Sequence, residues 1–113
     1  MHELSLAIDM VAQLEKALVN EGDCAIERVH VLLGVLSGVE PDSFEFCFPV
    51  AAEGTRAQGA ELVIEKAPIV LSCRACGAES RPEKPAAICQ KCLSTDVDIV
   101  SGREFIVKSM EVS

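Results

Sequence analysis

Two Cys-x-x-Cys pairs constrain this chain more than any other feature of its sequence. Cys73 and Cys76 form the first pair, Cys89 and Cys92 form the second, and twelve residues lie between them. Two intervening residues allow one tight turn to direct two thiolates at the same cation, and a second such turn completes a tetrahedron of sulfurs. The spacing therefore predicts one Zn(II) ion bound by all four cysteines.

Three other chemistries share this spacing or part of it. Two disulfides would need an oxidising compartment, iron would give a rubredoxin-like site, and a thioredoxin-type redox centre would use one pair and not two. Zinc is the preferred interpretation. A zinc ion enclosed by four cysteines has no position for water, so such a site is structural and not catalytic.

The residues that follow each pair differ. Gly77 follows the first pair, where the turn needs a residue that tolerates a positive φ. Leu93 stands at the equivalent position after the second pair. We therefore expect the second turn to be built somewhat differently from the first.

The charge of the chain limits its partners. Its 113 residues carry a formal net charge of −8, and four thiolates on one Zn²⁺ would make this −10. Such acidity disfavours nucleic acid, whose binding depends on Lys and Arg, and anionic membrane surfaces. No signal-peptide pattern and no apolar run near about 20 residues occurs. We therefore expect a cytoplasmic chain with reduced thiols and no membrane-spanning segment.

Hydrophobic periodicity predicts a helix and then a strand in the amino-terminal part. Residues 3–21 repeat apolar side chains at helical spacing, and Gly22 is placed to end that helix. Residues 25–36 alternate as a strand does. The predicted helix face consists of Leu4, Ala7, Ile8, Val11, Leu14 and Leu18, and the predicted strand core of Val29, Val31, Leu33 and Val35.

The segment 40–54 fits two structures. Its three phenylalanines alternate like a strand, whereas Phe44 and Phe48 also fit one face of a helix. Pro41 suits a first helical position, but Pro49 argues against a regular helix. Helix is the preferred interpretation.

The remaining chain reads as strands around a loop. Residues 60–71 have strand character, interrupted by Pro68, where we expect the chain to leave the main sheet. The segment 77–88 between the cysteine pairs reads as a solvated loop held by the metal. Two final strands are expected on either side of Ser101-Gly102.

The amino terminus carries a second indication of metal binding. The amine of Met1, the amide nitrogen of His2 and its imidazole can chelate one ion, and Glu3 can complete four nearly coplanar ligands. Such N and O ligation suits Ni(II) or Cu(II). The alternatives are a solvated terminal histidine and a carboxylate that stabilises the positive end of a helix.

Other reactive side chains give weaker signals. His30 reads as a surface or interface residue on the polar side of its strand, and Cys24 and Cys47 read as buried small apolar groups. No Ser-His-Asp set and no Gly-rich phosphate loop is recognisable. The sequence therefore does not predict an enzyme.

Taken together, these motifs resemble the HypA/HybF family of nickel metallochaperones for [NiFe] hydrogenase maturation. The resemblance extends over essentially the whole chain. It is carried by Met1-His2-Glu3, the run Leu36-Ser37-Gly38-Val39-Glu40-Pro41, the two cysteine pairs, Gly102-Arg103-Glu104-Phe105 and Ser109-Met110-Glu111-Val112.

The resemblance implies an α+β fold, in which a small sheet packs against two helices and a four-cysteine, zinc-ribbon-like module is inserted. The nickel-binding domain would comprise residues 1–70 and 100–113, and the zinc-binding domain residues 71–99.

The resemblance also implies the ligands and the partners. Ni(II) would be held by Met1 through its amine, by His2 and by Glu3, with Glu40 as a further acidic candidate, and the four cysteines would hold Zn(II). Family members work with a nickel-binding GTPase, HypB, and deliver nickel to the hydrogenase large-subunit precursor, and some also serve urease maturation.

Overall fold

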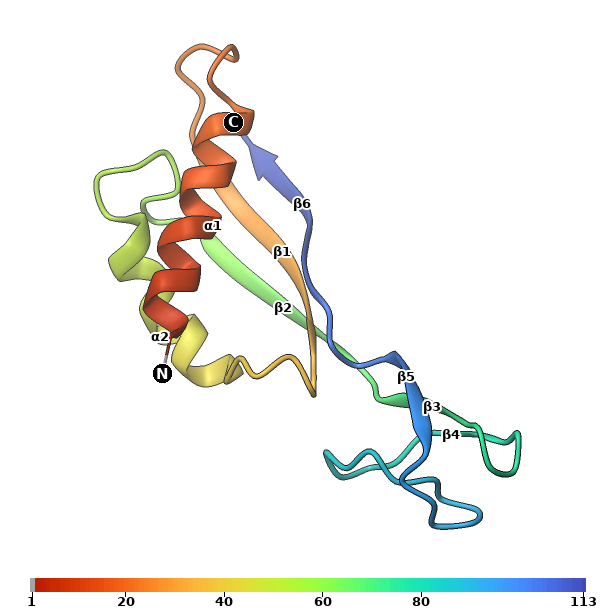
Figure 1. The fold of residues 1–113 in the computed structure, drawn as a ribbon. Coiled ribbons are helices and arrows are strands. Elements are labelled where there is room, and N and C mark those ends of the chain that lie inside the picture. Colours follow the sequence, from red (N-terminus) through yellow and green to blue (C-terminus); the bar gives the residue numbers. More distant parts are fainter. Residues whose placement is uncertain (1) are drawn as a thin grey trace. The chain divides into compact units, whose positions relative to one another are not determined.

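The computed structural model describes residues 2–113 and orders them into two helices and six strands. Figure 1 shows the ribbon with each element labelled. In chain order these are α1 (Glu3–Ala17), β1 (Ile26–Gly34), α2 (Pro41–Ala52), β2 (Glu61–Ala67), β3 (Val70–Cys73), β4 (Glu79–Ser80), β5 (Val97–Ser101) and β6 (Phe105–Val112).

The strands form two sheets of three strands each. The first has the order β2-β1-β6, and the second has the order β4-β3-β5 with antiparallel pairing on both sides of β3. Both predicted helices are present, so the expected α+β fold with a four-cysteine module is confirmed. The short strand β4 lies in the segment 77–88, where only a loop was expected.

The chain divides into two compact units, which are described separately below. The first, here the helical unit, comprises Met1–Val31, Val39–Ile64 and Val107–Ser113, and the second, here the cysteine unit, comprises Leu32–Gly38 and Glu65–Ile106. The metal-binding domains expected at 1–70 with 100–113 and at 71–99 stay a prediction.

Helix α1 buries a narrower stripe than its sequence suggests. Its buried apolar residues are Ala7, Met10, Val11 and Leu14, followed by Leu18 just beyond its end. Leu4 and Ile8, which the periodicity placed on the core face, are 42% and 50% exposed. The prediction was therefore wrong for these two residues, because Met10 and not Ile8 completes the face that packs inward.

Helix α2 resolves the ambiguity of segment 40–54 in favour of a helix. Glu40 caps it by accepting a hydrogen bond from the backbone N–H of Ser43 at 2.7 Å. Phe44, Phe48 and Ala52 are buried on one face at four-residue steps. Pro49 lies on the exposed side, where water can bond the carbonyl group that its missing N–H leaves free.

Strand β1 supplies the centre of the first sheet. Val29, Val31 and Leu33 are each at most 1% exposed, as their alternation predicted, whereas Val35 follows the strand and is exposed. β2 ends at Ala67, directly before Pro68, as expected. Within residues 2–113, neither helix combines the length and the hydrophobicity that a membrane span requires.

A close backbone contact explains Gly34 at the end of β1. Its N–H donates to the carbonyl of Glu104 at 2.7 Å, and a Cβ atom there would lie 2.1 Å from the carbonyl oxygen of Gly102. That distance is far below van der Waals contact, so a residue with a side chain requires the backbone to move. This close backbone contact connects the last residue of β1 to the turn between β5 and β6.

Candidate metal centres

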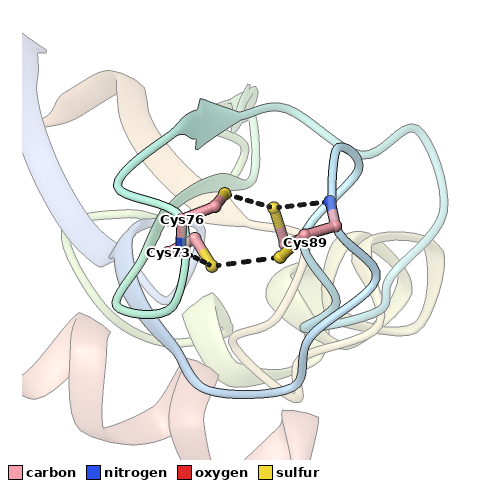
Figure 2. Close-up of side chains that lie close together, drawn as sticks. Cys73, Cys76 and Cys89 are labelled. Carbon is pink, nitrogen blue, oxygen red and sulfur yellow. Dashed lines mark hydrogen bonds between the residues drawn. The ribbon is translucent and has the colours of Figure 1, made fainter.

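Four sulfur atoms converge in the cysteine unit (Figure 2). The Sγ atoms of Cys73, Cys76, Cys89 and Cys92 all lie within 4.8 Å of one another. The sulfurs of Cys73 and Cys92 are 3.6 Å apart, and those of Cys76 and Cys89 are 3.7 Å apart. Groups of three or more His, Cys, Asp or Glu side chains can hold a metal ion when their ligand atoms lie close together. Among residues 2–113, the four cysteines form such a group.

The sulfur distances fit a tetrahedral metal site. A tetrahedral ion with Zn–S bonds of about 2.3 Å separates its sulfurs by about 3.8 Å. A disulfide would need an S–S distance of about 2.05 Å, and all four cysteines are free. The arrangement therefore matches the spacing prediction and leaves no disulfide in this cluster.

Backbone hydrogen bonds build the two turns in the same way. The N–H of Gly77 donates to the carbonyl of Cys73, and the N–H of Leu93 donates to the carbonyl of Cys89, both at 3.0 Å. Gly77 has φ +74°, and Leu93 has φ +63°. The expectation that the second turn would differ was wrong, because Leu93 adopts the left-handed conformation that glycine adopts in the first turn.

This conformation makes Leu93 a source of local strain. A left-handed conformation costs an L-residue about 1–2 kcal/mol, and the Leu93 side chain is 73% exposed, so burial offsets little of that strain. We expect Leu93→Gly to stabilise the zinc-loaded chain by up to about 1 kcal/mol, after allowing for the greater unfolded-state entropy of glycine. Denaturant unfolding would measure it.

The matched control for that prediction is Gly77→Ala at the first turn. It introduces the same strain where glycine now stands, so it should destabilise the chain by about 1 kcal/mol. A Leu93→Gly variant that unfolds at lower denaturant concentration than the parent would contradict the strain interpretation.

The pKa values of the clustered thiols indicate that a bound cation would stabilise their thiolate forms. The backbone N–H groups of Cys92 and Lys91 donate to the sulfur of Cys89 and lower the pKa of its thiol to about 6. At Cys92 the backbone N–H of Ser94 acts in the same direction, but the neighbouring sulfurs, Cys73 first, raise the pKa to about 12. Four thiolates at this spacing repel one another, and a divalent cation at their centre would remove that repulsion.

The second candidate centre lies at the start of α1 in the helical unit. Met1 lies outside the described residues. His2 is exposed and directly precedes the helix, whereas the side chain of Glu3 is buried. The carboxylate of Glu3 accepts a hydrogen bond from the backbone N–H of Glu40 at 3.2 Å. The structure thus places the backbone of Glu40 against the carboxylate of Glu3, although 37 positions separate the two residues in the chain.

The Glu3 carboxyl is held in its ionised form. The backbone N–H of Glu40 donates a hydrogen bond to this carboxylate and thereby lowers the pKa of the Glu3 carboxyl. Glu40 uses its own carboxylate to cap α2 through Ser43. A negatively charged oxygen therefore stands two residues from the chain end at neutral pH.

Histidine 30 belongs to neither metal centre. Its Nε2 atom lies 2.7 Å from Oε2 of Glu111, whose other oxygen accepts a hydrogen bond from Arg28 at 2.8 Å. Arg28 also pairs with Glu61. These half-exposed groups hold the three strands of the first sheet together at its surface, in agreement with the surface position expected for His30.

Cys24 and Cys47 are half-buried. The sequence had predicted that both would be buried. The sulfur of Cys24 accepts a hydrogen bond from Nη1 of Arg56 at 3.1 Å. Cys47 lines a surface hollow beside Glu3 that the sequence analysis missed. The signal that could have revealed it is Phe46, an apolar residue between two inward-facing phenylalanines.

The sequence is similar to those of known proteins over almost its whole length. A family model described as "Hydrogenase/urease nickel incorporation, metallochaperone, hypA" matches residues 1–112. The hydrogenase maturation factor HypA of Chlorobium limicola is 43% identical over 112 residues, covering 99% of this chain and 97% of that protein. The protein of the same description from Trichodesmium erythraeum is 40% identical over 112 residues, covering 99% and 96%.

Two solved structures have a similar fold. One, described as the solution structure of HypA protein, has a TM-score of 0.70 at 29% identity and covers 98% of this chain and 95% of its own. The other, the nickel metallochaperone HypA from Helicobacter pylori, has a TM-score of 0.68 at 29% identity, with coverage of 98% and 97%.

Proposed function

Because this chain belongs to the HypA family of nickel metallochaperones for hydrogenase maturation, we propose that it binds Ni(II) at its amino terminus and passes the ion on. The family consists of metallochaperones, so the chain is not an enzyme. The proposed ligands are the Met1 amine, the His2 amide and imidazole, and Glu3, with Glu40 beside them.

The observation that carries this proposal is the position of His2 and Glu3. His2 is exposed at the start of α1, so a partner can approach an ion bound there. Glu3 is anchored through its bond to Glu40 and keeps its negative charge. Nitrogen ligands from one chain end with a fixed carboxylate suit a square-planar divalent ion, and an open site allows the ligands to be exchanged for those of a recipient.

The four cysteines have a different role in this proposal. They would hold Zn(II) in a closed site without a water position, which gives structural stability and not catalysis. Reduced thiols are typical of the cytoplasm, and we place the chain there.

The proposed partners follow from the family. We propose that the chain works with the nickel-binding GTPase HypB and that the hydrogenase large-subunit precursor receives the ion. The family description also names urease, so urease maturation proteins are further candidate recipients.

The dependence of nickel affinity on pH tests the amide ligand. Binding to a deprotonated amide releases a proton, so the affinity should fall at least about tenfold per pH unit as the pH drops from about 9 to about 6. A site of amine, imidazole and carboxylates without the amide is almost fully deprotonated above about pH 8.5, and its affinity would level off there. Calorimetric titrations in buffers of different ionisation enthalpy would count the released protons. A flat affinity above about pH 8.5 would contradict amide ligation.

A further inference from the structure

Four exposed apolar side chains lie on the outer sides of the two helices in the helical unit. Leu4 and Ile8 project from α1 and are 42% and 50% exposed, and Phe46 and Val50 project from α2 and are 80% and 57% exposed. Each pair is separated by four positions, so its members lie one turn apart on the same side of their helix. These side chains do not contribute to the core, and exposed apolar groups gathered at one place are typical of an interaction surface.

One member of each pair, Leu4 from α1 and Phe46 from α2, lines a hollow between the two helices. Its volume is about 410 Å³, and its lining residues are Glu3, Leu4, Asp42, Ser43, Phe46 and Cys47. Both helices therefore contribute to one concave site, here the helix groove. A hollow of this volume is large enough to receive one or two side chains of another protein.

The lining of the helix groove includes two acids, Glu3 and Asp42, and no Lys or Arg. Asp42 lines the hollow, Asp9 follows Ile8, and Glu45 precedes Phe46, and all three acids are exposed. Helix α2 contains no Lys or Arg, and in α1 the single cation is Lys16 in the last turn. An occupant that is apolar at its centre and basic at its edges would complement this surface.

We propose that the helix groove is the docking site for a basic amphipathic helix of a partner protein. Apolar side chains of that helix, one turn apart, would cover Leu4, Phe46 and Val50. A Lys or Arg beside them would lie over the exposed ring of Phe46, a cation–π contact, and pair with Asp42. This geometry is the helix-in-groove mode of peptide recognition.

Other occupants fit less well. A two-fold dimer through the same surface would place the acidic residues of one copy against those of the other, which is repulsive. Nucleic acid and anionic lipid are repelled for the same reason. The inference goes beyond the proposed nickel carriage and does not depend on it: Glu3 lines the groove, but the docking contacts named here are made by Leu4, Asp42, Phe46 and Val50.

Selection from a phage-displayed library of random twelve-residue peptides, on the immobilised zinc-loaded full chain, tests this inference. Enriched peptides should combine Lys or Arg with apolar residues at helical spacing. A synthetic copy should shift the amide resonances of α1 and α2, and its binding should weaken as salt is added. Phe46→Ser and Asp42→Lys should each reduce its affinity at least about tenfold.

Matched controls separate docking from folding and from nickel binding. Val19→Ser removes an apolar side chain that is 68% exposed beyond α1, and Glu83→Lys reverses an exposed charge in the cysteine unit. Both should leave peptide affinity unchanged. Nickel titration of Phe46→Ser should match the parent, because Phe46 is no proposed nickel ligand and the substitution changes no charge, so docking and nickel carriage can fail independently. No enriched peptide, acidic or neutral consensus sequences, or full affinity in both groove variants would overturn the inference.

Discussion

We expect Cys89→Ser to abolish stoichiometric zinc binding and to unfold the loops of the cysteine unit. Cys89 is completely buried, and its sulfur accepts hydrogen bonds from the N–H groups of Lys91 and Cys92. Apart from β4, the segment between the cysteine pairs has no regular structure, so the metal replaces a hydrophobic core there. Structural zinc contributes about 10 kcal/mol or more to the folding of small metal-dependent modules.

Two measurements check this prediction together. Elemental analysis should show about one zinc per parent chain and almost none in the variant. Hydrogen exchange should show lost protection in β3, β4 and β5 while α1 and α2 keep theirs. Cys24→Ser is the control, because Cys24 lies in the helical unit outside the sulfur cluster. A Cys89→Ser variant that retains zinc and protection would refute the role assigned to the cluster.

The second large effect concerns nickel. We expect His2→Ala to weaken Ni(II) binding at least about 100-fold, more than the loss typical of outer-shell residues, because both the imidazole and its chelate ring disappear. Calorimetry on untagged zinc-loaded protein would measure this loss.

The other histidine provides a matched control. His30→Ala should leave nickel affinity unchanged, since His30 is bonded to Glu111 in the sheet. A chain that keeps its nickel affinity without His2 but loses it without His30 would move the site to the sheet surface.

Helix α1 shows how far periodicity could predict the fold. The spacing of Ala7, Val11 and Leu14 predicted both the helix and its core face. It could not predict that Leu4 and Ile8 stay exposed, because an apolar stripe wider than the buried face does not reveal which of its edges turns inward. That choice depends on the packing of α1 against α2, which the sequence of α1 alone does not contain.

Helix α2 and the second cysteine turn were harder for local rules. Pro49 counted against a helix, yet its exposed position makes the lost hydrogen bond tolerable. Leu93 counted against a glycine-like turn, yet closing the turn on Cys89 imposes a positive φ on it. In both places tertiary context outweighed a single-residue preference.

The two metal centres differed in how much the sequence revealed. Cysteine spacing alone predicted the sulfur cluster, because ligands two residues apart already share a turn. The contact between Glu3 and Glu40 spans 37 positions, and no local pattern could predict it; only the family resemblance pointed to Glu40. The helix groove was missed because it is formed by the outer sides of two helices that are distant in sequence.

The most direct test of the nickel proposal is a Ni(II) titration of the native chain beside a variant with one extra residue before Met1. The extra residue removes the free amine from its chelating position and leaves every side chain in place. The proposal predicts tight one-to-one binding by the native chain and a loss of at least about 100-fold in the extended one. Equal affinity in the two chains would show that nickel does not bind through the amino-terminal amine, and would contradict the central claim.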